Sequence, residues 1–485
     1  MKEIDDPWHS RPIDVHRWSD HPGVSDVVAP LWAAHFSDFA TPGRSGPKPK
    51  TTYEQQFRAL VLDLYVAWKT DPELSIGVPM SANAWDTNSR YNAIRLSKKM
   101  IPIVRRAHEV GLIDLAPGSF SGPDGLGNRN TRIRAAEPLQ ELFARAAFER
   151  GDVVRHRDQE CIVLKEGDKL VEYEDTDETR AMRARLNAYN ALLLRTFIDI
   201  PTLEEPFIER TVTTGPGEGE VERVAIADDQ KFVRRIFSRR RWDRNGRYYG
   251  PWWQQVGADW RQLIFINDVP TVEVDFQGLH VNLLSLEVGE RLVGDPYELP
   301  ASSLPGVPDQ LQRKIVKTLV LKAINARSKA SAFSSFRQDW PTGHMAKRLT
   351  DRELEELIDA FLEKHPYLRG KLCSDHGIRL MYVESCITDH VIMEATNHGL
   401  PVLGVHDSFI VPYDHVLRLK ALMRDAAVAV VGFDLPVDAN APGLDELPSE
   451  FTLGYIQSRQ TPRCSGYLRR LETHEERYGP LQDRG

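Results

Sequence analysis

Two aspartates that lie far apart in the chain, Asp275 and Asp407, each stand at the end of a segment with the pattern of a β-strand. Two apolar runs flank a tight His-Asp step in residues 402–411, which predicts a β-hairpin with the Asp407 carboxylate at its tip. Residues 271–276 alternate apolar and polar side chains, which predicts a strand that leads into Asp275. Asp407 alone would be interpreted as a turn-forming residue. Two carboxylates fixed at strand ends, however, are what a two-metal site for phosphoryl transfer requires.

Carboxylates of this kind favour Mg²⁺, which binds a few protein oxygens and completes its shell with water and phosphate oxygens. We therefore expect Asp275 and Asp407 to hold two Mg²⁺ ions, with Mn²⁺ as a substitute. The main-chain carbonyl of Phe276 is a further candidate ligand. His406 is expected to pack or hydrogen-bond beside the Asp407 carboxylate rather than to act as a general base.

Basic residues in a helical segment supply the cations that a triphosphate needs. Arg313 and Lys317 are four residues apart, so they share one helix face and reach phosphate groups together. A solvated amphipathic helix is the simpler interpretation, and the two are compatible because the apolar face packs while the basic face points into a cleft. Further candidates for contact with template or phosphate follow on the same segment: Lys322, Arg327 and Lys329.

Helical patterns surround these segments. Each begins or ends at residues that commonly cap helices, such as Gly399, Gly432 and the Thr350–Glu353 capping box. These patterns predict helices that pack against the strand and the hairpin. The expected helices cover residues 279–286, 350–362, 379–397 and 413–431.

Composition limits the class of protein. The 485 residues are 41% hydrophobic and 27% charged, which is typical of an ordinary soluble chain with two or three domains. The net charge of −8 gives no global indication of nucleic-acid binding, so such a role depends on local basic patches. Four scattered cysteines show neither zinc nor disulfide spacing, and no signal or membrane-spanning segment is evident. We therefore expect a cytoplasmic protein without a membrane partner.

The N-terminal half predicts a small DNA-binding domain. Helical periodicity in residues 52–68 and 96–111 is followed by two short strands, 112–115 and 130–134, around a Gly- and Pro-rich loop. This order resembles a winged helix-turn-helix domain, and the alternative is a small α+β domain with a solvated basic face. The side chains expected to contact DNA phosphates are Lys98, Lys99, Arg132 and Arg134.

Residues 231–249 mix eight Lys and Arg residues with five aromatic residues. A charge run alone is usually a solvated face, but a free surface would rarely expose so many rings. The mixture favours a surface that follows a nucleic-acid backbone, with the rings stacking on sugars or bases. The residues expected to contact nucleic acid here are Arg241, Arg244, Arg247 and Tyr248.

The order of these motifs resembles the superfamily of family A DNA polymerases and the single-subunit RNA polymerases of phages and mitochondria. Residues 243–247, Asp-Arg-Asn-Gly-Arg, are similar to the D-x-x-G-R motif of the RNA polymerases, and Asp275 stands where motif A would be. Residues 313–329 resemble motif B, and His-Asp-Ser-Phe at 406–409 matches motif C. The resemblance covers residues 231–431, under half of the chain.

The resemblance implies an α+β fold, a right-hand polymerase palm with helical fingers and thumb-like helices, preceded by the winged-helix-like domain. Two nucleotide-contacting positions depart from the pattern. Asn325 stands where motif B usually has a Tyr that seats the templating base, and His280 stands where DNA polymerases have Glu and RNA polymerases have Gly. A bulky His280 favours dNTPs, whereas the D-x-x-G-R and His-Asp-Ser-Phe motifs favour NTPs.

These features predict a template-directed nucleotidyltransferase that uses a DNA template and nucleoside triphosphates, in replication, priming or transcription of a mobile element. The alternative is a DNA-binding replication initiator or regulator with an inactive polymerase-like domain, and a nuclease with the same acidic pair is a third possibility. The expected parts are an extended N-terminal segment and linker (1–50), the winged-helix-like domain (51–150), a helical, thumb-like connector (151–230), the palm and fingers (231–450) and a flexible C-terminal tail (451–485).

Overall fold

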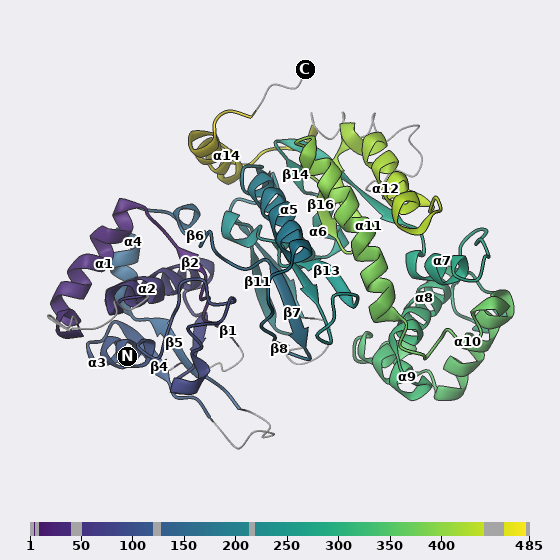
Figure 1. Cartoon of the computed structure of the whole chain (residues 1–485), viewed down its shortest axis with the longest axis horizontal. Helices are drawn as coiled ribbons and strands as arrows, with labels where there is room; N and C mark the ends of the chain where they lie inside the picture. The colour runs from purple at the N-terminus through teal and green to yellow at the C-terminus, as the bar shows by residue number, and fades with distance from the viewer. Residues whose placement is uncertain are drawn as a thin grey trace. The chain divides into compact units, whose positions relative to one another are not determined.

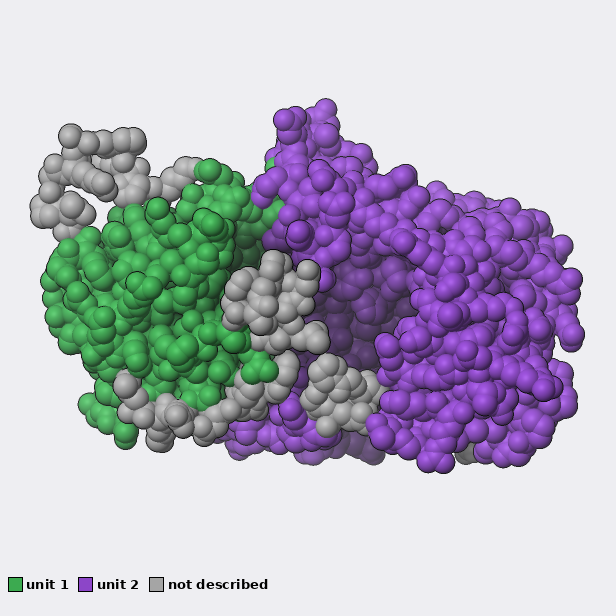
Figure 2. Space-filling view, turned by 90° about the horizontal axis from the view of Figure 1, so that it is seen from below, with its two compact units in different colours: residues 1–161, 225–232 green, residues 162–224, 233–485 purple. Residues whose placement is uncertain are grey.

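The computed structural model describes Ile4 and residues 9–39, 51–119, 128–212, 219–440 and 460–481. The chain mixes helices and sheets, which agrees with the α+β class, and it forms two compact units (Figures 1 and 2). Unit 1 contains residues 1–161 and 225–232, and unit 2 contains residues 162–224 and 233–485. The predicted linker at 42–50, and most of the two Gly-rich loops predicted at 116–128 and 214–220, lie outside the described residues. Within those described ranges, no helix is both long and apolar enough to span a bilayer.

Unit 1 is built on the buried helix α2 (Tyr53–Thr70), which opens with a capping box formed by Thr52 and Gln55. A single hydrophobic core joins α2 to the helices and strands around it. The sheet of this unit has the order β1-β3-β5-β4, with β1 parallel to β3 and the other pairs antiparallel. The remaining elements are α1 (Pro22–His35), α3 (Met100–Glu109), α4 (Glu137–Ala144), β1 (Ser10–Pro12), β3 (Ser75–Val78), β4 (Ile113–Ala116) and β5 (Thr131–Ala135).

The prediction of an extended N-terminal segment is wrong for residues 9–39. Strand β1 pairs with β3, and α1 buries Val24, Val28 and Leu31 in the core. The sequence signal is weak because β1 has three residues and α1 contains Pro30. These residues therefore belong to the first folded unit.

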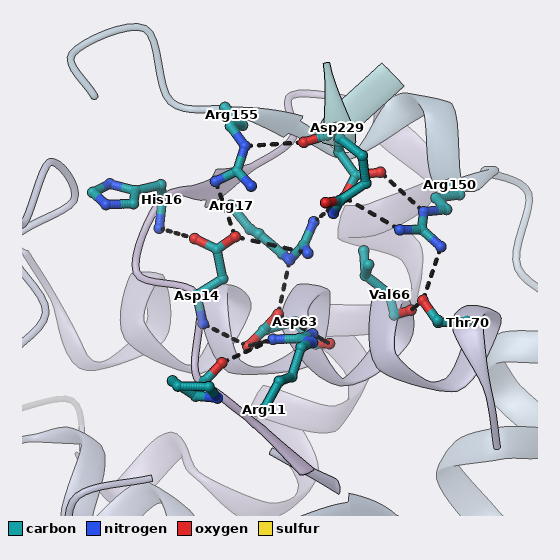
Figure 3. A network of polar contacts seen from close by, with 12 residues as sticks. Arg11, Asp14, His16, Arg17, Asp63, Val66, Thr70, Arg150, Arg155 and Asp229 are labelled. Atoms are coloured by element: carbon teal, nitrogen blue, oxygen red, sulfur yellow. Dashed lines mark hydrogen bonds and ion pairs between the residues drawn. The ribbon is translucent and has the colours of Figure 1, made fainter. Parts of the chain in front are cut away.

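A network of buried ion pairs joins distant segments of unit 1 (Figure 3). Arg17 Nε donates to Asp63 Oδ1 at 2.8 Å, and its Nη1 donates to Asp229 Oδ2 at 2.6 Å. Asp229 also accepts from Arg150 Nε at 2.9 Å. The network ties residues 225–232 to α2, so this segment belongs to unit 1 and not to the predicted connector. Nearby, β2 (Arg17–Trp18) pairs with β6 (Val154–Arg155).

The two strands of the predicted wing, β4 and β5, pair antiparallel as expected. They follow α3, and α3 follows α2, in the predicted order. In a helix-turn-helix, a short turn joins the two helices. Between α2 and α3, however, the described chain has strand β3 and a short 3-10 helix at Ala82–Ala84. The winged-helix assignment therefore stays a prediction.

The central sheet of unit 2 contains both predicted aspartate-bearing segments. β16 (Leu403–Val405) and β17 (Ser408–Pro412) form the predicted antiparallel hairpin, which is confirmed. β15 (Val269–Phe276), also predicted, pairs antiparallel with β17. Among the described strands the order is β16-β17-β15-β14-β9, with β14 at Phe265–Ile266, β9 at Ile198–Asp199 and β18 (Val437–Asn440) also paired with β15.

Three helices of unit 2 lie side by side in Figure 1: α5 (Asp177–Leu194), α11 (Gly377–Asn397) and α12 (Val416–Val431). The predicted helices over 379–397 and 413–431 are confirmed within about one turn at each end. Gly432 closes α12 in the left-handed conformation, with φ at 79°. Helix α11 packs against α5, α12 and, in the second sheet of this unit, β13.

The second sheet of unit 2 corrects the prediction of an exposed basic and aromatic surface over 231–249. Its order is β13-β12-β7-β8, and Phe237, Tyr248 and Arg235 are buried within it. Strand pairing and cover by α11 turn alternate side chains into the core, and a charge run in the sequence does not reveal this. The strands are β13 (Asn245–Tyr249), β12 (Arg234–Phe237), β7 (Ile162–Glu166) and β8 (Lys169–Leu170), and β10 (Phe207–Thr211) pairs separately with β11 (Val221–Ala225).

A group of helices lies at one end of unit 2, to the right in Figure 1. It comprises α7 (Leu279–Leu286), α8 (Asp309–Asn325), α9 (Lys329–Gln338) and α10 (Asp351–Lys364). The predicted capping box is present, because Thr350 Oγ1 accepts from Glu353 N while the Glu353 side chain accepts from Thr350 N. The face of unit 2 seen in Figure 2 is deeply hollowed.

The prediction of a flexible C-terminal tail is wrong for Ser465–Tyr478, which forms helix α14. Tyr467 is fully buried and its hydroxyl donates to Asp268 at 2.8 Å, while Arg470 Nε donates to Asp199 at 2.7 Å. The high charge of this segment concealed its buried face. Residues 451–459 and 482–485 of the predicted tail lie outside the described part.

Candidate active site

The ladder between β15 and β17 brings the two predicted aspartates together. Asp275 lies directly opposite Ser408, and Asp407 is the residue before Ser408. The main-chain N–H of Phe276 donates to the Asp407 carbonyl at 3.5 Å. The sequence-predicted pair therefore shares one end of the central sheet of unit 2.

The hairpin that carries Asp407 is held from the neighbouring segment. Trp253 Nε1 and Gln254 Nε2 both donate to the Gly404 carbonyl, at 3.2 and 3.0 Å. His406, in the turn, has a φ of 59° and its ring meets that of Tyr249 edge-on at 5.7 Å. These contacts fix the turn and leave the carboxylate of Asp407 outside the strand ladder.

The environment of Asp275 disfavours its charged form. Burial raises the pKa of Asp275 to about 8, and the like charge of Asp407 adds to the effect, while Lys317 opposes it. Asp275 Oδ1 is buried and has no hydrogen-bond partner among the described residues. A buried carboxylate oxygen without a partner is costly, and a bound cation would remove that cost.

Asp407 also interacts with a third carboxylate, Glu384 of α11, which is only 1% exposed. Glu384 Oε2 lies 2.9 Å from His280 Nε2, and the same oxygen pairs with Arg247. Burial opposes ionisation of Glu384, but the contacts with His280 and Arg247 outweigh it, so its pKa is lowered. Burial and the negative charge of Glu384 raise the pKa of Asp407, against the effect of Arg247.

Buried polar atoms without a partner gather around these side chains. Such atoms are rare in folded proteins, because nearly all buried polar groups are hydrogen-bonded. A cluster of them is what a site has when a ligand supplies the missing partners. Within the described residues the cluster consists of Asp275 Oδ1, Glu384 Oε1, His280 Nδ1, His406 Nδ1 and Arg247 Nε.

The Asp-Arg-Asn-Gly-Arg sequence has a local structural explanation. Gly246 has a φ of 78°, and a Cβ there would lie 2.6 Å from Ser385 Oγ of α11, so the position accommodates only glycine without strain. This close approach lets the next residue, Arg247, reach Glu384. Asp243 accepts from both Arg241 and Arg244 at 2.7 Å, so these two predicted nucleic-acid contacts are engaged within the turn.

Helix α8 carries the predicted phosphate-binding cations, and both lie near the site. Lys317 is half-buried and its charge acts on Asp275. Arg313 is exposed and pairs with Asp295. Asp295 also accepts from the main-chain N–H of Tyr297, at 2.8 Å. Tyr297 is fully buried, and its pKa is raised by burial and by the charge of Asp407.

Several predicted contacts have other partners in the structure. Tyr248 is buried and its hydroxyl donates to Asp389 at 2.6 Å, so its ring does not form a stacking surface. Asn325 is the exposed last residue of α8, and its Nδ2 donates to the Leu321 carbonyl at 2.8 Å. The three further cations pair with acidic groups: Lys322 with Asp339, Arg327 with Asp375 and Lys329 with Glu355.

The predicted DNA contacts of unit 1 divide in the same way. Lys98 is exposed just before α3. Lys99 Nζ donates to the Thr51 carbonyl at 2.9 Å, and Arg132 is half-buried with two nitrogens that lack a partner. Arg134 is only 5% exposed and pairs with Asp114, which corrects its assignment as a phosphate contact. Its neighbours Ile133 and Ala135 turn into the core, so Arg134 lies on the opposite face of β5, where Asp114 faces it from β4.

The carboxylate oxygens of Asp275 and Asp407 are the kind of donor that Mg²⁺ prefers. Among the described residues, no three His, Cys, Asp or Glu side chains are grouped as a metal site with three protein ligands would require. Mg²⁺ commonly uses one or two carboxylates together with water and phosphate oxygens. Asp275, with its unpartnered buried oxygen, and Asp407 meet that requirement.

Sequence reasoning missed Glu384 and Tyr297. Glu384 is one of three acidic residues in the predicted helix over 379–397, and its place beside Val383 gave only a weak signal of burial. Tyr297 lies in an irregular segment between α7 and α8, where no periodicity indicates burial.

Comparison of this chain with known protein families and with curated proteins gave no match.

Proposed function

We propose that unit 2 catalyses template-directed nucleotidyl transfer on DNA. In this reaction the 3′-hydroxyl oxygen of a growing strand bonds to the α-phosphorus of a nucleoside triphosphate. The bond from that phosphorus to the bridging oxygen breaks, pyrophosphate leaves, and the hydroxyl proton is lost to solvent. The proposal combines the four motifs in their order with the site geometry.

One observation carries the proposal. The two motif aspartates, Asp275 and Asp407, adjoin each other on the β15–β17 ladder, within a cluster of buried polar atoms that lack partners. Burial raises the pKa values of both carboxylates, the charge of Asp407 adds to the effect on Asp275, and the charge of Glu384 adds to the effect on Asp407, so the site favours a cation over the empty state. When bound there, two Mg²⁺ ions would activate the nucleophile and stabilise charge on the transferring phosphate.

The other side chains have distinct roles in this proposal. Lys317 faces the carboxylates from α8 and is placed to hold the triphosphate. Arg313 would exchange its carboxylate partner, Asp295, for a phosphate group when the nucleotide binds. His280 and Arg247, fixed by Glu384, would use their unpartnered nitrogens to contact the sugar and the strand end. The fixed donors would orient the substrates without further rearrangement.

Primer extension tests the proposal directly. The wild-type protein is incubated with a primed DNA template, Mg²⁺ and either dNTPs or NTPs, alongside an unprimed template. Asp407→Ala should abolish incorporation, whereas Asp425→Ala, at an exposed position on α12, should leave it unchanged. The preferred sugar is read from the same experiment.

The two alternatives give different results in this assay. DNA binding without incorporation by the wild-type protein would favour a replication initiator or regulator with an inactive polymerase-like domain. Loss of nucleotides from the primer end, abolished by Asp407→Ala, would favour a nuclease that uses the same carboxylates.

A further inference from the structure

Unit 2 contains a pocket of about 510 Å³ whose lining includes cationic and imidazole side chains. Its size is within the range of sites for small organic ligands. No acidic residue is among the described residues that line it. The lining side chains that matter here are Arg195, Arg418, His398, His415, His474 and Tyr478.

This pocket is separate from the candidate active site. It lies at the C-terminal end of α11, where His398 follows Glu384 by fourteen residues, or about 21 Å of helix. It also includes Pro412, five residues after Asp407 along β17, which corresponds to about 17 Å of strand. A ligand in this pocket would therefore not occupy the space beside Asp275 and Asp407.

The side chains of the two arginines of the pocket have no protein partner among the described residues. Arg195 and Arg418 are exposed, and neither forms an ion pair or a side-chain hydrogen bond with any described residue. Most arginines of unit 2 near the active site, by contrast, are paired with carboxylates, as Arg247 is with Glu384. Guanidinium groups that line a pocket without a carboxylate are suited to an anion, and phosphate is an anion whose geometry they match well.

A structural role for these arginines must be weighed, because α5, α11 and α14 all end at the pocket and helix C-termini attract cations. One carbonyl in the last turn of each helix has a local main-chain donor. Thr196 N donates to Leu193 at 3.2 Å, Leu400 N to Ala395 at 2.9 Å, and Gly479 N to Glu475 at 2.8 Å. The side chains of Arg195 and Arg418 donate to no described carbonyl, so they are not consumed as helix caps.

We propose that this pocket binds a phosphate group carried on a nucleoside, with Arg195 and Arg418 holding the phosphate. The rings of His474 and Tyr478, whose centroids are 4.9 Å apart, supply an aromatic wall for the base. The phosphate comes either from a free mononucleotide or from the end of a nucleic-acid strand. This inference does not depend on the polymerase activity proposed above.

Calorimetric titration of the full chain in EDTA tests the proposal, because removal of divalent cations weakens nucleotide binding at the candidate active site. The probes are inorganic phosphate, AMP and a 5′-phosphorylated dithymidylate. The variants are Arg195→Ala/Arg418→Ala, Arg195→Lys/Arg418→Lys and, as a matched control, Arg352→Ala, which removes an exposed arginine on α10.

AMP or the dinucleotide should bind the wild-type protein and the Arg352→Ala control equally, and bind the double alanine variant at least tenfold more weakly. The double lysine variant should retain intermediate affinity, since it keeps the charge but loses the planar fork. Preference for AMP identifies a free nucleotide as the ligand, and preference for the dinucleotide identifies a strand end. Absence of saturable binding to the wild-type protein, unchanged affinity in the alanine variant, or binding of inorganic phosphate with no gain from the nucleoside would each overturn the assignment.

Discussion

The buried carboxylate of Asp275, which lies near the like charge of Asp407, predicts a specific pH dependence of the unfolding free energy in the metal-free protein. An unfolded chain ionises this group near pH 3.8, whereas burial and Asp407 raise its pKa to about 8 in the folded state. The folded state therefore binds the proton more tightly, and stability contributed by the protonated group is lost as pH rises from about 4 to about 8. At 1.36 kcal/mol per pKa unit, the loss is up to about 6 kcal/mol. Asp275→Asn removes the ionisation and should abolish this loss.

Urea denaturation in EDTA at pH 5 and pH 8.5 measures the effect as the difference in unfolding free energy between variant and wild type. Asp275→Asn should become more stable than wild type by several kcal/mol at the higher pH, with a much smaller difference at pH 5. Mg²⁺ at pH 8.5 should stabilise the wild-type protein and not the variant. Asp425→Asn, on the exposed face of α12, is the matched control. If Asp275→Asn leaves the pH dependence unchanged, the electrostatic account of the site is refuted.

Three further changes test the packing around the site and the core of unit 1. Glu384→Ala leaves Arg247 and His280 buried without their carboxylate partner. It should lower the free energy of unfolding, measured by thermal denaturation, by about 3–5 kcal/mol. A decrease below about 1 kcal/mol would show that these ion pairs are not desolvated. Gly246→Ala should lower the free energy of unfolding by about 1–3 kcal/mol more than Gly289→Ala does. Both glycines have a similar positive φ, but only at Gly246 would an added Cβ meet a neighbouring side chain. Equal decreases for the two variants would contradict the predicted clash. Arg17 and Arg150 lower the pKa of Asp229 against its burial, so its stabilising effect is full above about pH 4 and declines only as the pH falls from there toward the lowered folded-state pKa. Asp229→Asn should therefore destabilise unit 1 strongly at pH 7 and still strongly, by only about 1 kcal/mol less, at pH 3, as followed by urea denaturation against an Asp26→Asn control, and an effect that vanishes by pH 3 or grows as the pH falls would exclude the ion-pair account.

Local patterns predicted the elements of unit 2 well wherever the signal lay in adjacent residues. The His-Asp turn between two apolar runs, the alternation before Asp275 and the caps at Thr350 and Gly432 all appear at their expected positions. Turns, alternation and caps depend on residues within a few positions of one another, so a single sequence contains them in full.

Composition gave a misleading picture wherever burial depended on distant partners. The basic and aromatic run predicted an exposed surface, yet Arg235 and Tyr248 are buried because Asp389 of α11, more than 140 residues later, receives them. Arg134 is buried for the same reason, since Asp114 lies on the neighbouring strand. A charge is tolerated inside a protein only when its partner is present, and the partner is a product of tertiary folding.

The sequence by itself determined that two aspartates end on strands and that a basic helix face follows the first of them. Only the tertiary structure decided that Glu384 and His280, 104 residues apart, would meet in one buried pair, and that Arg247 would join them across 137 residues. The physical reason is that strand register and helix packing, rather than local spacing, determine which distant side chains share a solvent-excluded space.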